Sequence, residues 1–426
     1  MTGTLEERIA QLALDTFNSC LPPKCKPRND PATGVQEWVP MSAIVFAQQI
    51  DNNDTPPTLH LAALATGSKC LPANILPKAS GLILHDSHSE ILALRALNYF
   101  FLREALQILT TPDYTSKYLI YNKNTPQNEY PFSIHPSTSI HLFSTEPPCG
   151  DASMEFIISA QPDATPWSIP STNNQTKDPL KIPSLPGRSY FSNLSIVRRK
   201  PSRPDAPPTL SKSCTDKLTL KQFTSVLSSL SSLLISPQNA YIATFTVPFD
   251  KYNEGGYTRA FTTNGRLRNL PEDIETQKIE GGGGVYSFHP LTPTPLPKDF
   301  IFTYKYSKPP PQDTKTKASN ISTLYINHPE NPTITEVLIS GVKQGNGQLS
   351  TAPGDRKGSV VCRKKMWQLL RDISDILGNQ ELKERVERKV YAELKTDNNE
   401  RSTMKDTVTR TLGGWEKNRG DHDWGL

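Results

Sequence analysis

The stretch that decides the fold is Asp86–Glu90, DSHSE, which stands at the start of the clearest helical pattern in the chain. From 88 to about 106, apolar side chains recur at helical spacing, which predicts a helix beginning at His88. Two further segments have the same setting, because EPPCGDAS at 146–153 and SCTDK at 213–217 also precede segments expected to be helical. One histidine and two cysteines are therefore each expected at a helix N-terminus.

These residues, His88, Cys149 and Cys214, have the chemistry of metal ligands. The helix dipole and the free N–H groups at a helix start favour the thiolate, which is the form of cysteine that binds metal. Three such ligands leave one tetrahedral position of zinc open for water, as in catalytic rather than structural sites. Glu90 stands two residues after His88 and can take a proton from a zinc-activated water and pass it to a leaving amine. The sequence predicts a catalytic zinc centre with Glu90 as its proton shuttle.

The pattern matches in part the H-x-E and P-C-x-x-C signature of zinc nucleobase deaminases. No second cysteine follows Cys149 at that spacing, which leaves the distant Cys214 as the candidate third ligand. Taken singly, each motif also has an explanation without function, since H-x-E occurs by chance and a lone buried cysteine is usually a small apolar side chain. The order of the three segments, each before a helix, favours the functional interpretation. The other cysteines are interpreted as structural thiols: Cys20, Cys25, Cys70 and Cys362.

Strands and helices alternate along the 426 residues, which predicts an α/β protein with one domain spanning 1–426. An apolar helix is expected from 214 to 234, and a helical C-terminal part over about 359–395. Strands are expected at 39–48, 59–65, 138–144, 240–247, 322–326 and 335–339. Polar, proline-rich stretches are expected to be loop insertions at 111–137, 160–188 and 289–318.

Composition limits where such a protein works. No run of about 18 apolar residues is present, which argues against a membrane helix, and the N-terminal segment lacks the pattern of a signal peptide. The 6 cysteines are too sparse for a disulfide scaffold, so we expect an intracellular protein of the nucleus, the cytoplasm or both. A net charge of +5 permits a nucleic-acid partner without requiring one.

The three motifs resemble those of the adenosine deaminases acting on RNA and tRNA, most closely the tRNA-specific branch of eukaryotes and a fungal member of it. Supporting matches lie at Thr66–Cys70, at Glu336–Ile339 and at Gly413–Trp415. The resemblance implies a cytidine-deaminase-like core, in which a mixed sheet carries the zinc-bearing helices. It also implies that a helical C-terminal part and the proline-rich insertions enlarge this core.

The resemblance implies roles for individual residues. His88, Cys149 and Cys214 would bind zinc, and Glu90 would move the proton. Two residues stand where relatives contact the flipped nucleotide: Ser68 and Lys69. The densest basic cluster is expected to meet RNA phosphates: Arg198, Arg199, Lys200 and Arg203.

Members of this family also bury an inositol hexakisphosphate in the core. The physical reason is that many cations cannot be buried together without a polyanion that neutralises them and accepts their hydrogen bonds. The expected contributors are Arg95, Ser211, Lys217, Ser229, Arg363, Tyr391, Lys395, Trp415 and Lys417.

The expected substrate follows from how an adenine is reached. The base must leave its stack or lie in an open loop before it can be deaminated. The family match begins by about residue 39 and leaves no room for the double-stranded RNA-binding domains of duplex editors, so we expect a loop substrate. The branch implies zinc-dependent hydrolysis of adenosine to inosine in tRNA, at position 37 beside the anticodon of alanine tRNA.

Two alternatives remain open from the sequence. One is an adenosine-to-inosine editor of another structured RNA. The other is a non-catalytic, zinc-containing RNA-binding protein that has kept the fold, although the carboxylate of Glu90 argues against it. Neither DNA, a membrane nor a protein partner is implied.

Overall fold

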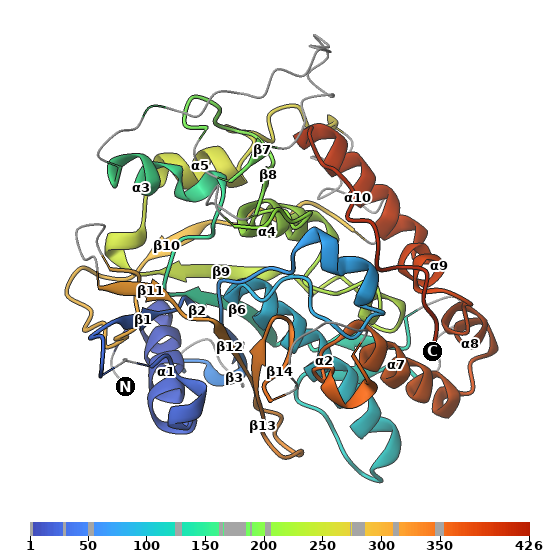
Figure 1. Ribbon diagram of the computed structural model, residues 1–426. Coiled ribbons are helices and arrows are strands. Elements are labelled where there is room, and N and C mark those ends of the chain that lie inside the picture. Colours follow the sequence, from blue (N-terminus) through green and yellow to red (C-terminus); the bar gives the residue numbers. More distant parts are fainter. Residues whose placement is uncertain are drawn as a thin grey trace, which may run out of the picture.

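The computed structural model describes most of the chain, namely residues 3–28, 31–49, 55–123, 130–161, 165, 185–187, 190–200, 206–272, 274, 286–309, 315–345 and 353–426. Within them, helices pack on both faces of a central sheet of eight strands, in the order β10-β9-β6-β2-β3-β12-β13-β14 (Figure 1). The strands are β2 Met41–Gln48, β3 Thr58–Thr66, β6 Thr138–Ser144, β9 Ile242–Val247, β10 Pro293–Pro295, β12 Ile321–Ile326, β13 Ile334–Ile339 and β14 Val342–Lys343.

The sheet is mixed. Strands β6, β9 and β10 run parallel to one another, whereas β2, β3, β12, β13 and β14 form antiparallel pairs. Strand β2 is buried along its whole length, as expected for a strand covered on both faces. The expectation of a mixed α/β fold is therefore confirmed.

Helices cover the two faces through two separate apolar clusters. Helix α2 (Ser89–Thr110) lies on one face, where its Leu97 and Phe100 share a cluster with Ile44 and Phe46 of β2. Helix α1 (Leu5–Cys20) lies on the other face against alternate side chains of the same strand, including Val45. The alternation follows from the two-residue period of a strand.

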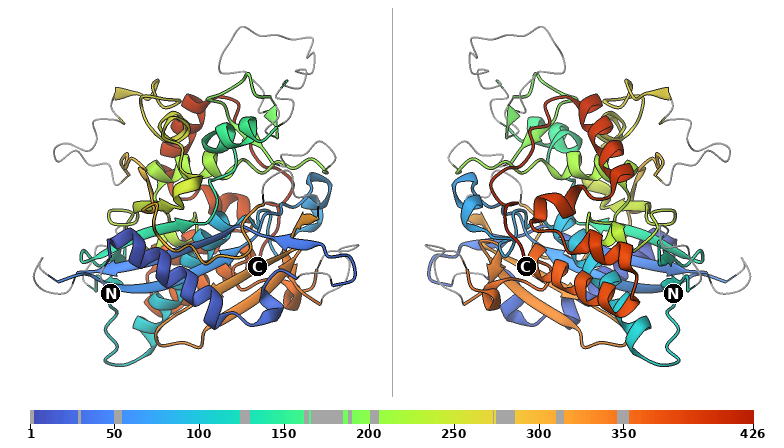
Figure 2. Two further views of the ribbon diagram at one scale, coloured as in Figure 1. Left: turned by 90° about the vertical axis from the view of Figure 1, so that its left-hand side faces the viewer. Right: turned by 90° about the vertical axis from the view of Figure 1, so that its right-hand side faces the viewer.

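The C-terminal part is helical, as expected, and extends the α2 side of the molecule. Helix α7 packs on α2, and α10 packs on α4. In opposite side views, α1 faces the viewer in one and the C-terminal helices in the other (Figure 2). The C-terminal helices are α7 Arg363–Leu377, α8 Gln380–Val386, α9 Tyr391–Thr396 and α10 Asn399–Leu412. Earlier in the chain stand α3 Met154–Ser159, α4 Cys214–Thr224 and α5 Glu254–Phe261.

Two stretches expected to be loops contain strands. The range 111–137 holds β4 (Leu119–Tyr121) and β5 (Phe132–Ile134), an antiparallel pair whose apolar side chains enter the α2 core. The range 289–318 supplies the edge strand β10, together with β11 (Thr316–Ala318), which pairs with β1 (Gln36–Trp38). Composition averaged over a long polar stretch hides short apolar segments such as β4 and β5, whereas β10 and β11 are polar and form strands through pairing with remote segments. Most of 160–188 lies outside the described residues, apart from short β7 (Leu185–Pro186), which pairs with β8 (Arg198–Arg199).

The expectation of one apolar helix from 214 to 234 is wrong. Helix α4 ends at Thr224, because Ser225 has a φ of 56° and turns the chain. The apolar residues that follow, such as Val226 and Leu230, are still buried, in an irregular segment. Their spacing reflected burial in the core rather than helix continuation. The described residues contain no helix that is both long and apolar enough to cross a membrane.

Candidate active site

The structure brings His88, Cys149 and Cys214 together from three separate elements. His88 is the residue immediately before α2, Cys149 lies in the turn after β6, and Cys214 is the first residue of α4. The Cys149 sulfur lies 3.6 Å from Nδ1 of His88, and the backbone N–H of Cys214 donates to that sulfur at 3.3 Å. All three ligand atoms lie within 4.8 Å of one another.

The donor set fits zinc. Two thiols and one imidazole are soft to borderline ligands, and three of them leave a tetrahedral position open. A hydrogen bond with Cys214 holds the pKa of Cys149 well below its usual range, which favours the thiolate needed for metal binding. The backbone amide that points at Cys149 belongs to the first turn of α4, so the helix start favours the same charge.

Glu90 lies against this ligand set and is almost completely buried. Its Oε2 accepts hydrogen bonds from the Cys214 thiol at 3.3 Å and from the Ser89 hydroxyl at 3.2 Å. Burial raises the pKa of the Glu90 carboxyl, with a further contribution from the charge of Cys149. A carboxyl group with a raised pKa can both take up and release a proton near neutral pH, as a proton shuttle must.

Asp86 organises the charges beneath the ligands. Its carboxylate accepts hydrogen bonds from the ammonium groups of Lys200, at 2.8 Å and 3.1 Å, and of Lys217. The Ser211 hydroxyl donates to the same carboxylate at 3.0 Å, and the backbone N–H of His88 donates to it as well. Asp86 thus joins the start of α2 to the Lys200 segment and to α4.

Lys200 is buried at this centre and is not a surface cation. Its Nζ also lies 3.2 Å from the sulfur of Cys214. Burial alone would lower the pKa of Lys200, but Asp86 and the cysteine thiolates raise it well above its usual range. These contacts differ from the expectation that Lys200 meets RNA phosphates, because its ammonium group faces inward to the metal ligands.

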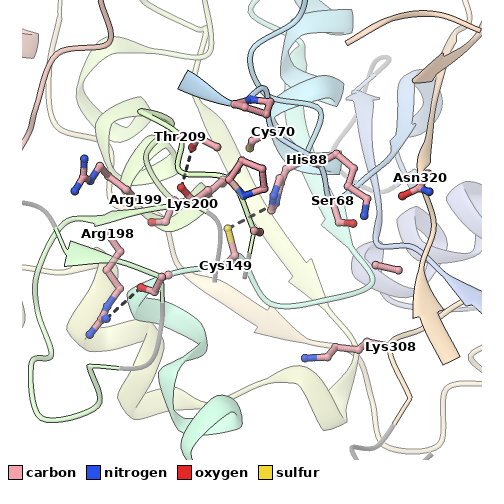
Figure 3. Close-up of a pocket in the computed structure, with 18 of the residues that line it drawn as sticks. Ser68, Cys70, His88, Cys149, Arg198, Arg199, Lys200, Thr209, Lys308 and Asn320 are labelled. Carbon is pink, nitrogen blue, oxygen red and sulfur yellow. Dashed lines mark hydrogen bonds between the residues drawn. The ribbon is translucent and has the colours of Figure 1, made fainter. Parts of the chain in front are cut away.

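A cavity of about 770 Å³ opens onto the ligands (Figure 3). His88 and Cys149 lie at its centre, and Ser68 and Lys69 line it, as expected for residues near the substrate. The Ser68 hydroxyl is buried and makes no hydrogen bond within the described residues. It is therefore available to a bound molecule.

The basic cluster at 198–203 divides into different roles. The Arg198 side chain is buried, and its guanidinium donates to the backbone carbonyl oxygens of Gly187, Tyr190 and Asn193. Arg198 therefore holds its own loop, unlike the expected phosphate contact. Arg199 is partly exposed and lines the cavity, with an ion pair to Glu416 at 3.1 Å. Arg203 lies outside the described residues.

The residues expected around a polyanion fall into three groups. Ser211 and Lys217 lie on Asp86. Arg95, Arg363, Tyr391 and Lys395 gather between α2 and the C-terminal helices, where the Arg363 guanidinium lies over the Tyr391 ring at 5.6 Å. Arg363 also pairs with Asp421 at 2.9 Å.

The remaining three expected residues lie at the margins. The Trp415 ring packs against an apolar cluster that includes Phe223 of α4 and Val408 of α10. The Lys212 ammonium lies 6.0 Å from the centroid of this ring. The Lys417 side chain is 73% exposed. Ser229 lies in the irregular segment after α4, where its carbonyl oxygen accepts from the Ser232 hydroxyl.

Three cations that complete the middle group were not predicted from the sequence: Lys221, Arg401 and Lys405. Burial and neighbouring cations lower the pKa of Lys405 to about 7 and that of Lys395 to about 8. Burial and the nearby Arg401 hold the pKa of Lys221 well below its usual range. We call Arg95, Lys221, Arg363, Lys395, Arg401 and Lys405 the cation cluster. One sequence signal could have pointed to these three cations. Lys217 and Lys221 are four residues apart, as are Arg401 and Lys405, and this spacing puts each pair on one helix face.

Comparison with known proteins identifies the family. A model of the adenosine-deaminase (editase) domain matches residues 63–419. The chain belongs to this family, and it is an enzyme that deaminates adenosine.

Individual relatives agree with this assignment. The chain is similar to tRNA-specific adenosine deaminase 1 of Schizosaccharomyces pombe, with 33% identity over 391 residues that cover 92% of this chain and 89% of the relative. For tRNA-specific adenosine deaminase 1 of Saccharomyces cerevisiae, identity is 30% over 273 residues, which cover 64% of this chain and 65% of the relative. The double-stranded RNA-specific editase Adar of Drosophila melanogaster is 26% identical over 176 residues, covering 41% and 25% respectively.

Proposed function

We propose that this enzyme uses zinc to convert adenosine to inosine in tRNA, at position 37 next to the anticodon of alanine tRNA. The observation that carries the proposal is the convergence of His88, Cys149 and Cys214 beside the buried Glu90, with His88 and Cys149 on the wall of a cavity. Support for tRNA comes from the fungal relatives named as tRNA-specific.

The reaction consumes water and releases ammonia, so a proton must move from the attacking water to the leaving amine. A zinc ion bound by His88, Cys149 and Cys214 would act as a Lewis acid that makes water nucleophilic near neutral pH. Glu90 takes the proton from water and gives it to the departing nitrogen. The Lys200 ammonium lies 3.2 Å from the Cys214 sulfur, where it would favour the thiolate once zinc is bound, and the Ser68 hydroxyl is available to hydrogen-bond the substrate.

The test of the catalyst is Glu90→Gln. We expect zinc content and melting temperature close to wild type and inosine formation at least about 100-fold slower, because general acid–base catalysis contributes that much or more. Glu381→Gln, on an exposed position of α8, is the matched control and keeps full activity. Turnover retained in Glu90→Gln would remove Glu90 from the shuttle role. Loss of inosine with loss of zinc would make it a structural residue.

The test of the substrate compares an alanine tRNA transcript with a perfect RNA duplex, with inosine read by reverse transcription and sequencing. We expect inosine beside the anticodon of the tRNA and none in the duplex. Editing of the duplex alone would favour the other structured-RNA alternative, and no editing by a zinc-loaded, folded protein would favour the non-catalytic one.

We also propose that the cation cluster binds inositol hexakisphosphate. The supporting observation is that partial burial and neighbouring cations lower the pKa of Lys395 and Lys405, and that burial lowers the pKa of Arg401, which disfavours their charged forms until a polyanion balances them. Denaturing the purified protein should release about one inositol phosphate per chain, measured by mass spectrometry and phosphate analysis. A folded, active protein that releases none would overturn this assignment.

A further inference from the structure

The cavity has an aromatic residue on its wall that the reaction does not use. Trp38 is the last residue of β1, is half-buried, and lines the cavity together with His88 and Cys149. The ammonium group of Lys308 lies over the indole, 5.9 Å from the ring centroid. A flat aromatic surface and a positive charge are thus presented at the same place.

The part of the cavity wall that Trp38 forms, called the Trp38 wall below, is held in position by backbone hydrogen bonds. Strand β1 pairs with β11, and the Trp38 carbonyl oxygen accepts a hydrogen bond from the backbone N–H of Ser319 at 2.8 Å. The Tyr304 hydroxyl donates to the next carbonyl oxygen, that of Val39, at 2.7 Å. The segment therefore presents Trp38 on a rigid backbone.

The wall is also tied to the metal-ligand turn. The backbone N–H of Lys308 donates to Oε1 of Glu146 at 3.0 Å, and Glu146 stands three residues before Cys149. This carboxylate therefore ties the Lys308 segment to the turn that carries Cys149, and Lys308 in turn lies over Trp38.

The cavity has room for more than the reacting base. Its volume of about 770 Å³ lies in the upper part of the usual range for small-molecule sites, about 300–1,000 Å³. In Figure 3, Arg198 and Arg199 lie on one side of His88 and Cys149, and Lys308 and Asn320 lie on the other. A strand that delivers an adenosine to the centre can therefore contact the Trp38 wall with an adjoining nucleotide.

We propose that Trp38 stacks on the base next to the target adenosine and that Lys308 contacts the phosphate of the same nucleotide. This inference rests on the proposed function, since it requires an RNA substrate. Every base has a face that stacks on an aromatic ring, and a splayed loop leaves its bases unstacked, so stacking on Trp38 would stabilise the open form. Trp38 is then a positioning residue for the substrate strand and not a catalytic one.

The test is a double-mutant cycle between protein and RNA. Wild type and Trp38→Leu, which keeps apolar bulk without the aromatic face, are titrated in a Glu90→Gln background with an anticodon stem-loop RNA. The RNA is used intact and with the base removed on either side of the target adenosine. We expect Trp38→Leu to weaken binding of intact RNA by about 5- to 100-fold. RNA lacking the stacked base should bind wild type and Trp38→Leu equally, and Trp38→Phe should bind intact RNA nearly as wild type does.

The proposal is overturned if Trp38→Leu weakens binding by the same factor whether a neighbouring base is present or removed, and if this holds for the base on either side of the target adenosine. The same holds if Trp38→Phe binds as poorly as Trp38→Leu. Because binding is measured without turnover, this failure is distinct from failure of the proposed function, which is a lack of inosine formation by the enzyme with intact Glu90.

Lys308→Ala gives a second readout that does not depend on folding of the Trp38 variants. Removing one phosphate contact should reduce the slope of log affinity against log salt by about 0.7. Lys305→Ala, an exposed lysine on the same segment that does not line the cavity, is the control and should leave the slope unchanged. An unchanged slope in Lys308→Ala would remove the phosphate contact.

Discussion

The molecule contains two groups of charged side chains, one buried beside the candidate metal ligands and one half-buried in the cation cluster, whose charges are balanced in different ways. Beside the metal ligands, Asp86 accepts hydrogen bonds from both Lys200 and Lys217, so the chain supplies its own anion. In the cation cluster, the Lys221 ammonium donates to the carbonyl oxygens of Val226 and Leu227. Among the described residues, no carboxylate pairs with Lys221, Lys395, Arg401 or Lys405. Asp86 thus balances the first group within the protein, whereas in the second only Arg363 has a carboxylate partner among the described residues, Asp421, and we propose that a bound polyanion balances the others.

The largest expected effect tests the internally balanced group. Asp86→Asn leaves the buried Lys200 and the partly buried Lys217 without their anion, which should lower the free energy of unfolding by about 3–5 kcal/mol. It should also abolish detectable inosine formation, because Lys200 then lacks the partner that holds it at Cys214. Denaturant unfolding and the tRNA assay check the two outcomes.

The matched control is Asp375→Asn, which breaks an exposed pair with Lys383 and should change the free energy of unfolding by less than about 1 kcal/mol. If Asp86→Asn were as stable as this control, the internal charge balance around Asp86 would be wrong.

The next largest effect is a change in melting temperature when a cation of the cation cluster is removed, and the sign of that change is the test. Lys405→Met removes a half-buried charge that lies near Lys395 and Arg401. With a bound polyanion, the variant should melt several degrees lower and release less inositol phosphate, because each such cation stabilises the bound anion. Without one, removing a repelled cation should raise the melting temperature. We expect the decrease, and an increase would show that the cluster is empty.

The pH dependence sharpens the same comparison. In protein stripped of its anion, the folded chain binds fewer protons than the unfolded chain above about pH 7, since the pKa is lowered to about 7 for Lys405 and to about 8 for Lys395. The free energy of unfolding should therefore rise with pH from about 7 towards 10, where unfolded lysines also lose their protons. A bound polyanion restores the lysine charges and should flatten this rise. Calorimetry of stripped and native protein from about pH 7 to 10 distinguishes the rising profile from the flattened one. Identical profiles for the two preparations would contradict a role for the anion in balancing these lysines.

The smallest effect is expected at the margin of the cluster. The Lys417 side chain is 73% exposed, and its ammonium lies 3.6 Å from a carboxylate oxygen of Asp406. Lys417→Ala should change the free energy of unfolding by no more than about 0.5 kcal/mol and leave the inositol phosphate content at the wild-type value. A loss of bound anion equal to that of Lys405→Met would make Lys417 a full member of the cluster.

The fold was predictable where local signals were strong. The helix after DSHSE and the buried strand β2 lie near their expected positions, because apolar periodicity records which faces meet the core. The hairpin β4–β5 was not predicted, since each strand has only three residues and stands among polar ones. The end of α4 was missed because the positive φ of Ser225 comes from its packing rather than from a turn residue such as glycine.

The basic residues show where prediction from sequence stops. Arg198, Arg199 and Lys200 are neighbours in the chain and all line the cavity, yet the guanidinium of the first holds a loop, that of the second pairs with Glu416, and the ammonium of the third lies on Asp86 and Cys214. The residue type alone does not show whether a lysine side chain is solvated or buried. Its role is decided by segments that are distant in sequence.

By itself, the sequence determined the mixed α/β fold, and it marked His88, Glu90 and Cys214 through short motifs at helix starts and Cys149 through a motif that the structure places in the turn after β6. These are local signals, since the chemistry of a helix N-terminus is written in a few adjacent residues. Only the tertiary structure decided that Lys200 faces inward, that the cation cluster exists and that Trp38 shares a cavity with the candidate metal ligands His88 and Cys149. Burial and charge balance depend on contacts between remote segments, so they arise only when the sheet and the C-terminal helices are packed together.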